Sequence, residues 1–519
     1  MLPKSESTNK MHMLHLIFKH KSATPFFHKI LMVAATLIFT LVLLLLALKI
    51  WGKEYYATSV DLAHHYGLIQ TIALVKGVNL NHPLYSYLGG MQLYPPVTHV
   101  LAVILGGLMG SYLRGMFFVS LIALFGIYLF IGWMIKFKEL IPSLISSFTF
   151  LVLLCCFHRT NIFVGGEIIE NFFFAQLVGF FIFLAMVFFI GILSAHFIIK
   201  GTISLFITFV LGWVYPISAI EFAAASLIFP LLSLHQQKTF KNVSWKFATC
   251  WIIFTILQGA AIILHPSFTF MKNVSTNEGG MAVFLPPDLS IILLTSSLAI
   301  LVCVLLRTMT RSFSGLSNLS ILIVSAGGIC AASIAQLLLF YLIHMGSRYG
   351  TEKHIFAVST LIAAIVSVLV ACPFRKMKIA TPSLANMLLP SVTAMIALAI
   401  ILPKQGAPIK PLDKYQQAIA NLTDRRFIIQ DHTVSANSHF SAVENFIVST
   451  GDLHFDIATA LGFNINPVYL GDAYPKLLAD HQIQFELTSQ DSNPPQNCIR
   501  QYLPDNIVIV DYRCIENKG

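Results

Sequence analysis

Long uninterrupted apolar segments constrain this chain more than any other feature. Residues 30–50 carry no charge until Lys49, and residues 171–195 contain no ionisable side chain at all. Each segment is near the roughly 20 residues that an α-helix needs to cross a bilayer. Only 11% of the 519 residues are charged, against about 25% in soluble domains. The pattern predicts an integral membrane protein whose main solvent is lipid.

The apolar segments predict an all-α polytopic membrane protein with about eleven transmembrane helices. The expected spans are 30–50, 97–113, 115–135, 140–157, 171–195, 201–229, 247–265, 289–307, 319–344, 354–372 and 381–402. The segment 201–229 is interrupted by Gly212-Trp-Val-Tyr-Pro216. It is either one kinked helix or two shorter ones.

The basic residues gather in short clusters between apolar segments, and the net charge is +10. The clusters are Lys4–Lys29, Lys238–Lys246, Arg307 with Arg311, and Arg375–Lys378. Membrane proteins concentrate Lys and Arg in cytoplasmic loops, so this charge predicts orientation rather than nucleic-acid binding. The N-terminus is expected in the cytoplasm, with residues 30–50 as a retained signal-anchor. Lys136 and Lys138 do not fit, because the span order places them outside.

Three parts follow from this topology: a basic cytoplasmic segment at 1–29, a transmembrane domain at 30–403 with a large outer loop at 51–96, and a polar C-terminal domain at 404–519. The segments 445–449 and 507–510 are strand-like, so the C-terminal domain is expected to be a small α/β domain. Cys498 and Cys514 flank a turn signal at nearly equal distance. They predict a disulfide across a hairpin, which needs an oxidising compartment. We expect a bacterial inner-membrane protein with a periplasmic C-terminal domain.

The first outer loop holds Asp61, His64 and His65 within a segment of helical apolar spacing. Residues three and four apart share a helix face, so these side chains are expected to lie together on an amphipathic surface helix. A carboxylate beside imidazoles suits proton transfer or metal binding. A solvated polar face is the alternative.

Three further groups are candidates, and each also has a structural explanation. Tyr94-Pro95-Pro96 ends the first loop, and tyrosine and proline there also suit an interface and a helix start. Glu167 and Glu170 precede an apolar helix, where acids also complement its dipole. Arg348, Tyr349 and Lys353 precede a late helix; the two cations could hold a phosphate or form anchoring ion pairs. Glu221 is ionisable within a membrane segment, which marks it as functional by default.

The layout resembles the GT-C superfamily of membrane glycosyltransferases. Four features carry the resemblance: Asp61 in a long loop after the first helix, Tyr94-Pro95-Pro96 before the second, a Gly-x-x-x-Glu-like element at Gly166–Glu170, and Tyr349 with Lys353. A C-terminal extracytoplasmic domain is also similar. The resemblance implies transfer of a sugar from a polyprenyl-phosphate carrier to a glycan, lipid or protein acceptor at the outer membrane surface.

The resemblance also implies residue roles. Asp61 would be the catalytic base, and Arg348 and Lys353 would stabilise the lipid phosphate. His64, His65, Tyr94, Glu167, Glu170 and Tyr349 complete the predicted substrate-binding set. Asp61 departs from the family's paired acids, since its nearest acidic neighbour is Glu54. A divalent metal is therefore allowed but not required. A transporter or flippase, and a non-catalytic assembly protein, remain alternatives.

Overall fold

A computed structural model describes most of the membrane part and a small piece of the C-terminal part. The described residues are 24–51, 60–81, 85, 89–109, 112–170, 173–193, 197–236, 245–275, 288–309, 317–377, 383–402, 446–448, 485–490, 493–503, 507–511 and 514. The N-terminal segment 1–23 and most of 404–484 lie outside this set.

The described chain is predominantly helical. Its longer helices are α2 (Thr24–Trp51), α3 (Val60–Val75), α5 (Val97–Met109), α6 (Tyr112–Met134), α7 (Leu140–Phe157), α9 (Phe174–Ile192), α10 (Phe197–Val214), α11 (Pro216–Gln236), α12 (Trp245–Ile263), α14 (Leu289–Met309), α15 (Ser317–Ile343), α17 (Ile355–Ala371) and α18 (Ser383–Ile401). Shorter ones are η1 (Gly89–Leu93), η2 (His158–Thr160), α8 (Gly166–Glu170), α13 (Phe268–Ser275), α16 (Arg348–Glu352) and η5 (Cys372–Lys376). Among these residues, eight helices are long and apolar enough to cross a membrane. The chain is an integral membrane protein.

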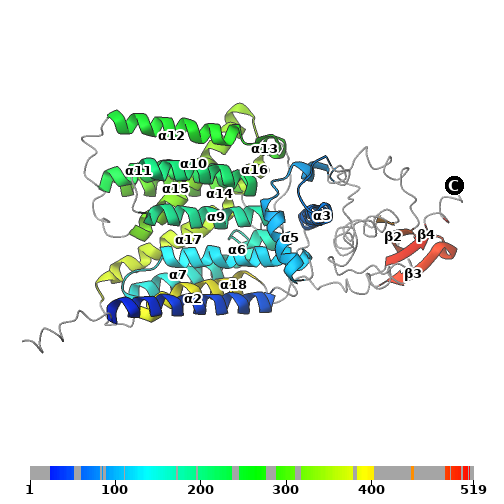
Figure 1. Cartoon of the computed structure of the whole chain (residues 1–519), viewed down its shortest axis with the longest axis horizontal. Coiled ribbons are helices and arrows are strands. Elements are labelled where there is room, and N and C mark those ends of the chain that lie inside the picture. The colour runs from blue at the N-terminus through cyan, green and yellow to red at the C-terminus, as the bar shows by residue number, and fades with distance from the viewer. Residues whose placement is uncertain are drawn as a thin grey trace, which may run out of the picture.

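The long helices lie side by side in one bundle, with α2 and α12 at opposite edges (Figure 1). Helices α6, α9, α15 and α17 are largely buried between the others, whereas α2 presents apolar side chains such as Leu37 and Ile38 outward. Such exposed apolar surface suits contact with lipid. Small residues allow close packing inside the bundle: Gly328 approaches Ala225, and Gly132 approaches Pro390. Helices α3, α13 and α16 lie at one end of the bundle, which we call the site end (Figure 1).

The interrupted segment 201–229 forms two helices. Helix α10 ends at Val214, Tyr215 is not helical, and α11 begins at Pro216. Proline disfavours the helical conformation of the residue before it and suits the first turn of a new helix. The two helices pack against each other and against α12, where the Trp251 Nε1 donates to the Leu227 carbonyl at 3.1 Å.

The predicted span 97–113 is shorter than expected. Helix α5 stops at Met109 and has 13 residues, which rise about 20 Å against the roughly 30 Å of a bilayer core. It packs closely on α6: an added Cβ at Gly115 would meet the backbone of Ala102 and Gly106. Figure 1 shows α5 set across the site end of the bundle rather than along it.

Lys136 and Lys138 lie at the opposite end of the helix bundle, which we call the basic end. The Asn386 Nδ2, near the start of α18, donates to the carbonyls of Phe137 at 3.1 Å and Lys138 at 2.8 Å. The Asn318 Nδ2, near the start of α15, donates to the Trp133 carbonyl at 2.8 Å. The expectation that these lysines lie away from the basic clusters is therefore wrong, because they sit where α15 and α18 begin, directly after the clusters at 307–311 and 375–378.

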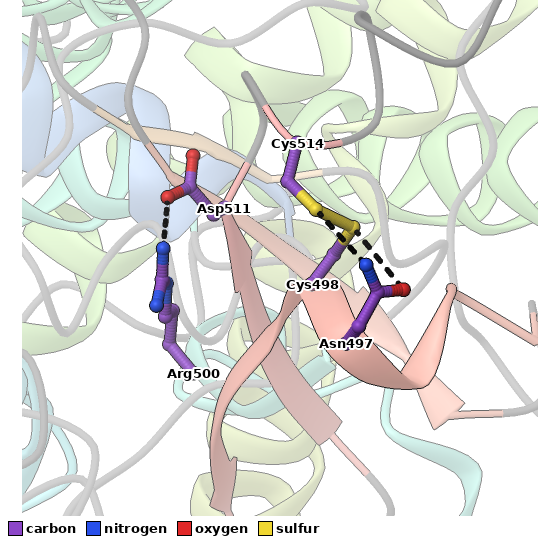
Figure 2. Close-up of a disulfide and its surroundings, with 5 residues drawn as sticks. All are labelled: Asn497, Cys498, Arg500, Asp511 and Cys514. Carbon is purple, nitrogen blue, oxygen red and sulfur yellow. Dashed lines mark hydrogen bonds and ion pairs between the residues drawn. A yellow bond between two sulfur atoms is a disulfide. The ribbon is translucent and has the colours of Figure 1, made fainter.

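The C-terminal part contains a four-stranded sheet of β1 (Phe446–Val448), β2 (Phe485–Ser489), β3 (Ile499–Leu503) and β4 (Ile507–Asp511), in the order β1-β2-β4-β3. Strand β1 is parallel to β2, and the other pairs are antiparallel. Cys498 and Cys514 form a disulfide across the β3–β4 hairpin, and Arg500 and Asp511 form an ion pair at 2.6 Å between the same strands (Figure 2). The expected domain boundaries at 1–29 and 404–519 stay predictions.

Candidate functional site

A pair of histidines joins the first loop to α5. His65 lies on helix α3 and is buried, and its Nδ1 is 2.9 Å from the Nε2 of His99. A hydrogen bond between two imidazoles requires one donor and one acceptor. The two rings therefore cannot both be fully protonated in this arrangement.

Aromatic rings enclose the histidine pair. Tyr94 meets the His65 ring edge-on at 5.2 Å between centroids and the His99 ring at 5.3 Å. Phe174 contacts the same two rings at 5.7 and 5.5 Å. Phe270 of α13 packs on Tyr94 at 4.7 Å. Edge-to-face packing of this kind holds rings in fixed orientations, so the cluster fixes α3 against the bundle.

Phe173, the residue before Phe174, contacts Lys353. The Lys353 Nζ lies 4.5 Å from the centre of the Phe173 ring and 4.3 Å from the Tyr349 ring, and the residue is 9% exposed. A cation over two aromatic faces is attracted by their negative quadrupoles. Phe173 and Phe174 are adjacent in sequence, so the predicted Tyr349–Lys353 element and the predicted His65–Tyr94 element contact neighbouring residues.

The backbone around Lys353 is anchored from three other helices. The Gln176 Nε2 donates to the Lys353 carbonyl at 2.7 Å. The next residue, His354, is buried, with its Nδ1 2.7 Å from Glu221 Oε1 and its Nε2 2.9 Å from Gln336 Oε1. Both ring nitrogens of His354 are therefore engaged, one with a carboxylate and one with a side-chain amide. Glu221 is therefore engaged in a buried pair that positions Lys353.

Arg348 is held by two carboxylates. Its Nη2 lies 2.8 Å from Asp288 Oδ1 and its Nε 2.6 Å from Glu352 Oε1. The side chain is 51% exposed. In this state the guanidinium serves as an ion-paired anchor, which was the structural explanation offered for it.

Glu167 belongs to a tight turn beneath Phe173. Its Oε2 accepts from the Gly165 N–H at 2.6 Å, and its carbonyl accepts from the Phe173 N–H at 3.2 Å. Gly165 has a φ of +106°, which favours glycine. Glu167 is 1% exposed, and burial raises its pKa to about 8, outweighing the backbone hydrogen bonds that lower it. The carboxyl shapes the turn that presents Phe173.

Some predicted site residues have side chains outside the described set. These are Asp61, His64 and Glu170, although all three positions lie in described helices, α3 and α8. Within the described residues, no group of three His, Cys, Asp or Glu side chains is arranged to hold a metal. One ring nitrogen of His65 is instead hydrogen-bonded to His99.

Several cluster residues carried no role in the sequence-based prediction: His99, Phe173, Phe174, Gln176, Gln336 and His354. His99 and His354 had a detectable signal, because an ionisable residue inside or at the end of an apolar helix is functional by default. The aromatic residues had none, since phenylalanine is abundant in every membrane segment.

Fold and site together define a helical integral membrane protein with a buried ionisable and aromatic cluster at one end of its bundle. No protein-family model matches the chain, and no curated protein matches its sequence. Among solved structures, the chain is similar to ArnT from Cupriavidus metallidurans in the apo state, with 12% sequence identity, a TM-score of 0.40, and coverage of 94% of this chain and 98% of that one. At this identity and TM-score, the likeness says nothing of what this chain binds or does.

Proposed function

We propose that the protein is a glycosyltransferase that moves a sugar from a polyprenyl-phosphate carrier to an acceptor hydroxyl at the outer surface of the membrane. The observation that supports the proposal is that His65 of α3 and Lys353 contact two adjacent residues at the site end, Phe174 and Phe173 respectively. Helix α3 bears Asp61 four residues before His65, and His65 packs on Phe174, next to the Phe173 that holds Lys353. A carboxylate base and a cation for a phosphate must act on one substrate.

The proposed orientation rests on charge. Lys136, Lys138 and the starts of α15 and α18 share the basic end, and positive residues favour the cytoplasmic side. The site end then faces outward. The disulfide between Cys498 and Cys514 fits the same assignment, since the C-terminal strands lie beyond the site end (Figure 1) and disulfides persist in oxidising compartments.

The chemistry is a direct displacement. The Asp61 carboxylate takes the proton of the acceptor hydroxyl as its oxygen bonds to the anomeric carbon, and the bond from that carbon to the phosphate oxygen breaks. The electron pair leaves with the polyprenyl phosphate, whose negative charge Lys353 neutralises. The Glu221–His354 pair and Gln176 keep Lys353 in place.

The test is release of polyprenyl phosphate from a panel of polyprenyl-phosphate hexoses and pentoses by purified protein supplied with a membrane lipid extract. We expect Asp61→Asn to lower the rate about 10²–10⁴-fold and Lys353→Gln about 10²–10³-fold. The controls are Glu139→Gln at the basic end and Lys272→Gln, which changes an exposed side chain of α13. Full activity of Asp61→Asn would remove Asp61 as the base, and inactivity of the wild-type protein on the whole panel would remove the function.

Transport remains the competing function, because Glu221 is buried within the membrane part and lies close to the helix break at Tyr215. An ion-coupled carrier would load or release a proton at Glu221. In the structure Glu221 is instead paired with His354. Substrate flux across proteoliposomes without release of polyprenyl phosphate, abolished by Glu221→Gln, would favour transport.

A further inference from the structure

A cleft lies between α10, α11, α12 and α15, away from the candidate site. It is lined by residues from the end of α9 (Ile190), the start of α10 (Phe197–Ser204) and the start of α15 (Ser320–Val324). Helix α15 begins where Asn318 bonds to the Trp133 carbonyl, so the cleft lies toward the basic end. Together with the open space in front of it, it spans about 1000 Å³.

The walls of the cleft are mostly aromatic. Phe197 and Phe247 pack together at 5.3 Å between ring centroids, and Trp251 and Phe254 of α12 continue the same wall. Phe254 lies over Gly201, where an added Cβ would strike its ring. Deeper along α12, the Gln258 Nε2 donates to Ser226 Oγ at 3.1 Å. The surface is therefore apolar along its length, with few polar groups.

Among the described residues that line the cleft, one is a cation. Lys200 is the fourth residue of α10 and lines the cleft. Within the described ranges, no carboxylate forms an ion pair with it. The cleft thus combines one amine close to the membrane surface with a long apolar wall running inward.

That combination matches one kind of occupant. The lining helices α9, α10 and α15 are long and apolar enough to span the bilayer, so lipid is the solvent expected around them. Basic pockets between membrane helices on the cytoplasmic side bind anionic headgroups. We infer that this cleft binds one anionic phospholipid of the leaflet at the basic end, with its phosphate on Lys200 and an acyl chain along Trp251 and Phe254. Lipid occupancy braces α12 against α10, which packs against it.

The test uses the purified full chain in detergent. Phosphatidylglycerol and phosphatidylcholine with the same acyl chains are titrated while the unfolding midpoint and the bound lipid, by native mass spectrometry, are followed. We expect the wild type to bind phosphatidylglycerol more tightly, and Lys200→Gln to weaken that binding about fivefold. Lys272→Gln removes the same charge from exposed α13 at the site end and is expected to change nothing.

Two arms separate the sources of the effect. Glycerol 3-phosphate lacks acyl chains, so an equal shift of the midpoint with this soluble anion would show an anion site and overturn the lipid assignment. Phe254→Ala, which removes part of the acyl wall, is expected to weaken both phospholipids alike. Equal binding of phosphatidylglycerol to wild type and Lys200→Gln would refute the inference, whatever the transferase assay shows.

Discussion

Replacing Glu167 with glutamine should remove a large pH-dependent loss of stability. The carboxyl is 1% exposed and lies in the turn before α9. Burial raises its pKa from 4.5 to about 8, because a charge loses hydration there that one Gly165 N–H does not replace. Glutamine keeps the shape and the acceptor oxygen but cannot ionise.

The sign follows from proton linkage. Below about pH 4.5 the carboxyl is protonated in both the folded and the unfolded state, so it does not lower the free energy of unfolding. As the pH rises, the unfolded chain ionises while the folded chain stays neutral, so stability falls until about pH 8 and is then constant. The shift corresponds to at most roughly 5 kcal/mol.

The assay is thermal unfolding of detergent-solubilised protein from pH 5 to 8.5, followed by tryptophan fluorescence. An unperturbed histidine ionises within this range and the chain has 18 of them, so the informative quantity is the difference between wild type and Glu167→Gln at each pH. We expect the unfolding midpoint of Glu167→Gln, relative to that of the wild type, to rise steadily up to about pH 8. Glu139→Gln, at a partly exposed position, is the matched control. Parallel curves for wild type and Glu167→Gln would refute the reasoning.

Three further predictions concern packing and the C-terminal sheet. Gly115→Ala should cost about 1–3 kcal/mol by overpacking, because its Cβ would meet the α5 backbone, whereas Gly107→Ala in α5 meets nothing within 4 Å and should preserve the unfolding midpoint. Asn386→Ala removes donors from two carbonyls and should cost about 1–3 kcal/mol in the same assay; an unchanged midpoint would contradict this. Cys498→Ser opens a disulfide of sequence separation 16 and should destabilise the sheet by about 3 kcal/mol, seen as faster proteolysis of the C-terminal part; free thiols in unreduced wild type would argue against the disulfide.

Most membrane helices could be predicted because their apolar segments are long and bounded by charge. The expected spans 171–195 and 30–50 correspond to α9 and α2 within a few residues. The break at Pro216 was also visible, since proline excludes the preceding residue from a helix. What the sequence left open was whether one helix bends or two form, because that depends on packing of α11 against α15.

The short helix α5 could not be predicted from hydropathy. Its apolar residues satisfy a span by composition, yet helix length and direction depend on the close approach of Gly115 to Ala102, a contact between separate helices. The histidine pair is a similar case. His65 and His99 are 34 residues apart, and only the packing of α3 on α5 makes them neighbours.

The two departures from the expected topology compensate each other. The span expected at 97–113 is too short to cross, while the segment 201–229 supplies two helices instead of one. One expected crossing is lost and one is gained, so the helices between α5 and α10 run in the opposite direction to the expected path. That reversal moves Lys136 and Lys138 to the basic end, which removes the conflict with the positive-inside rule.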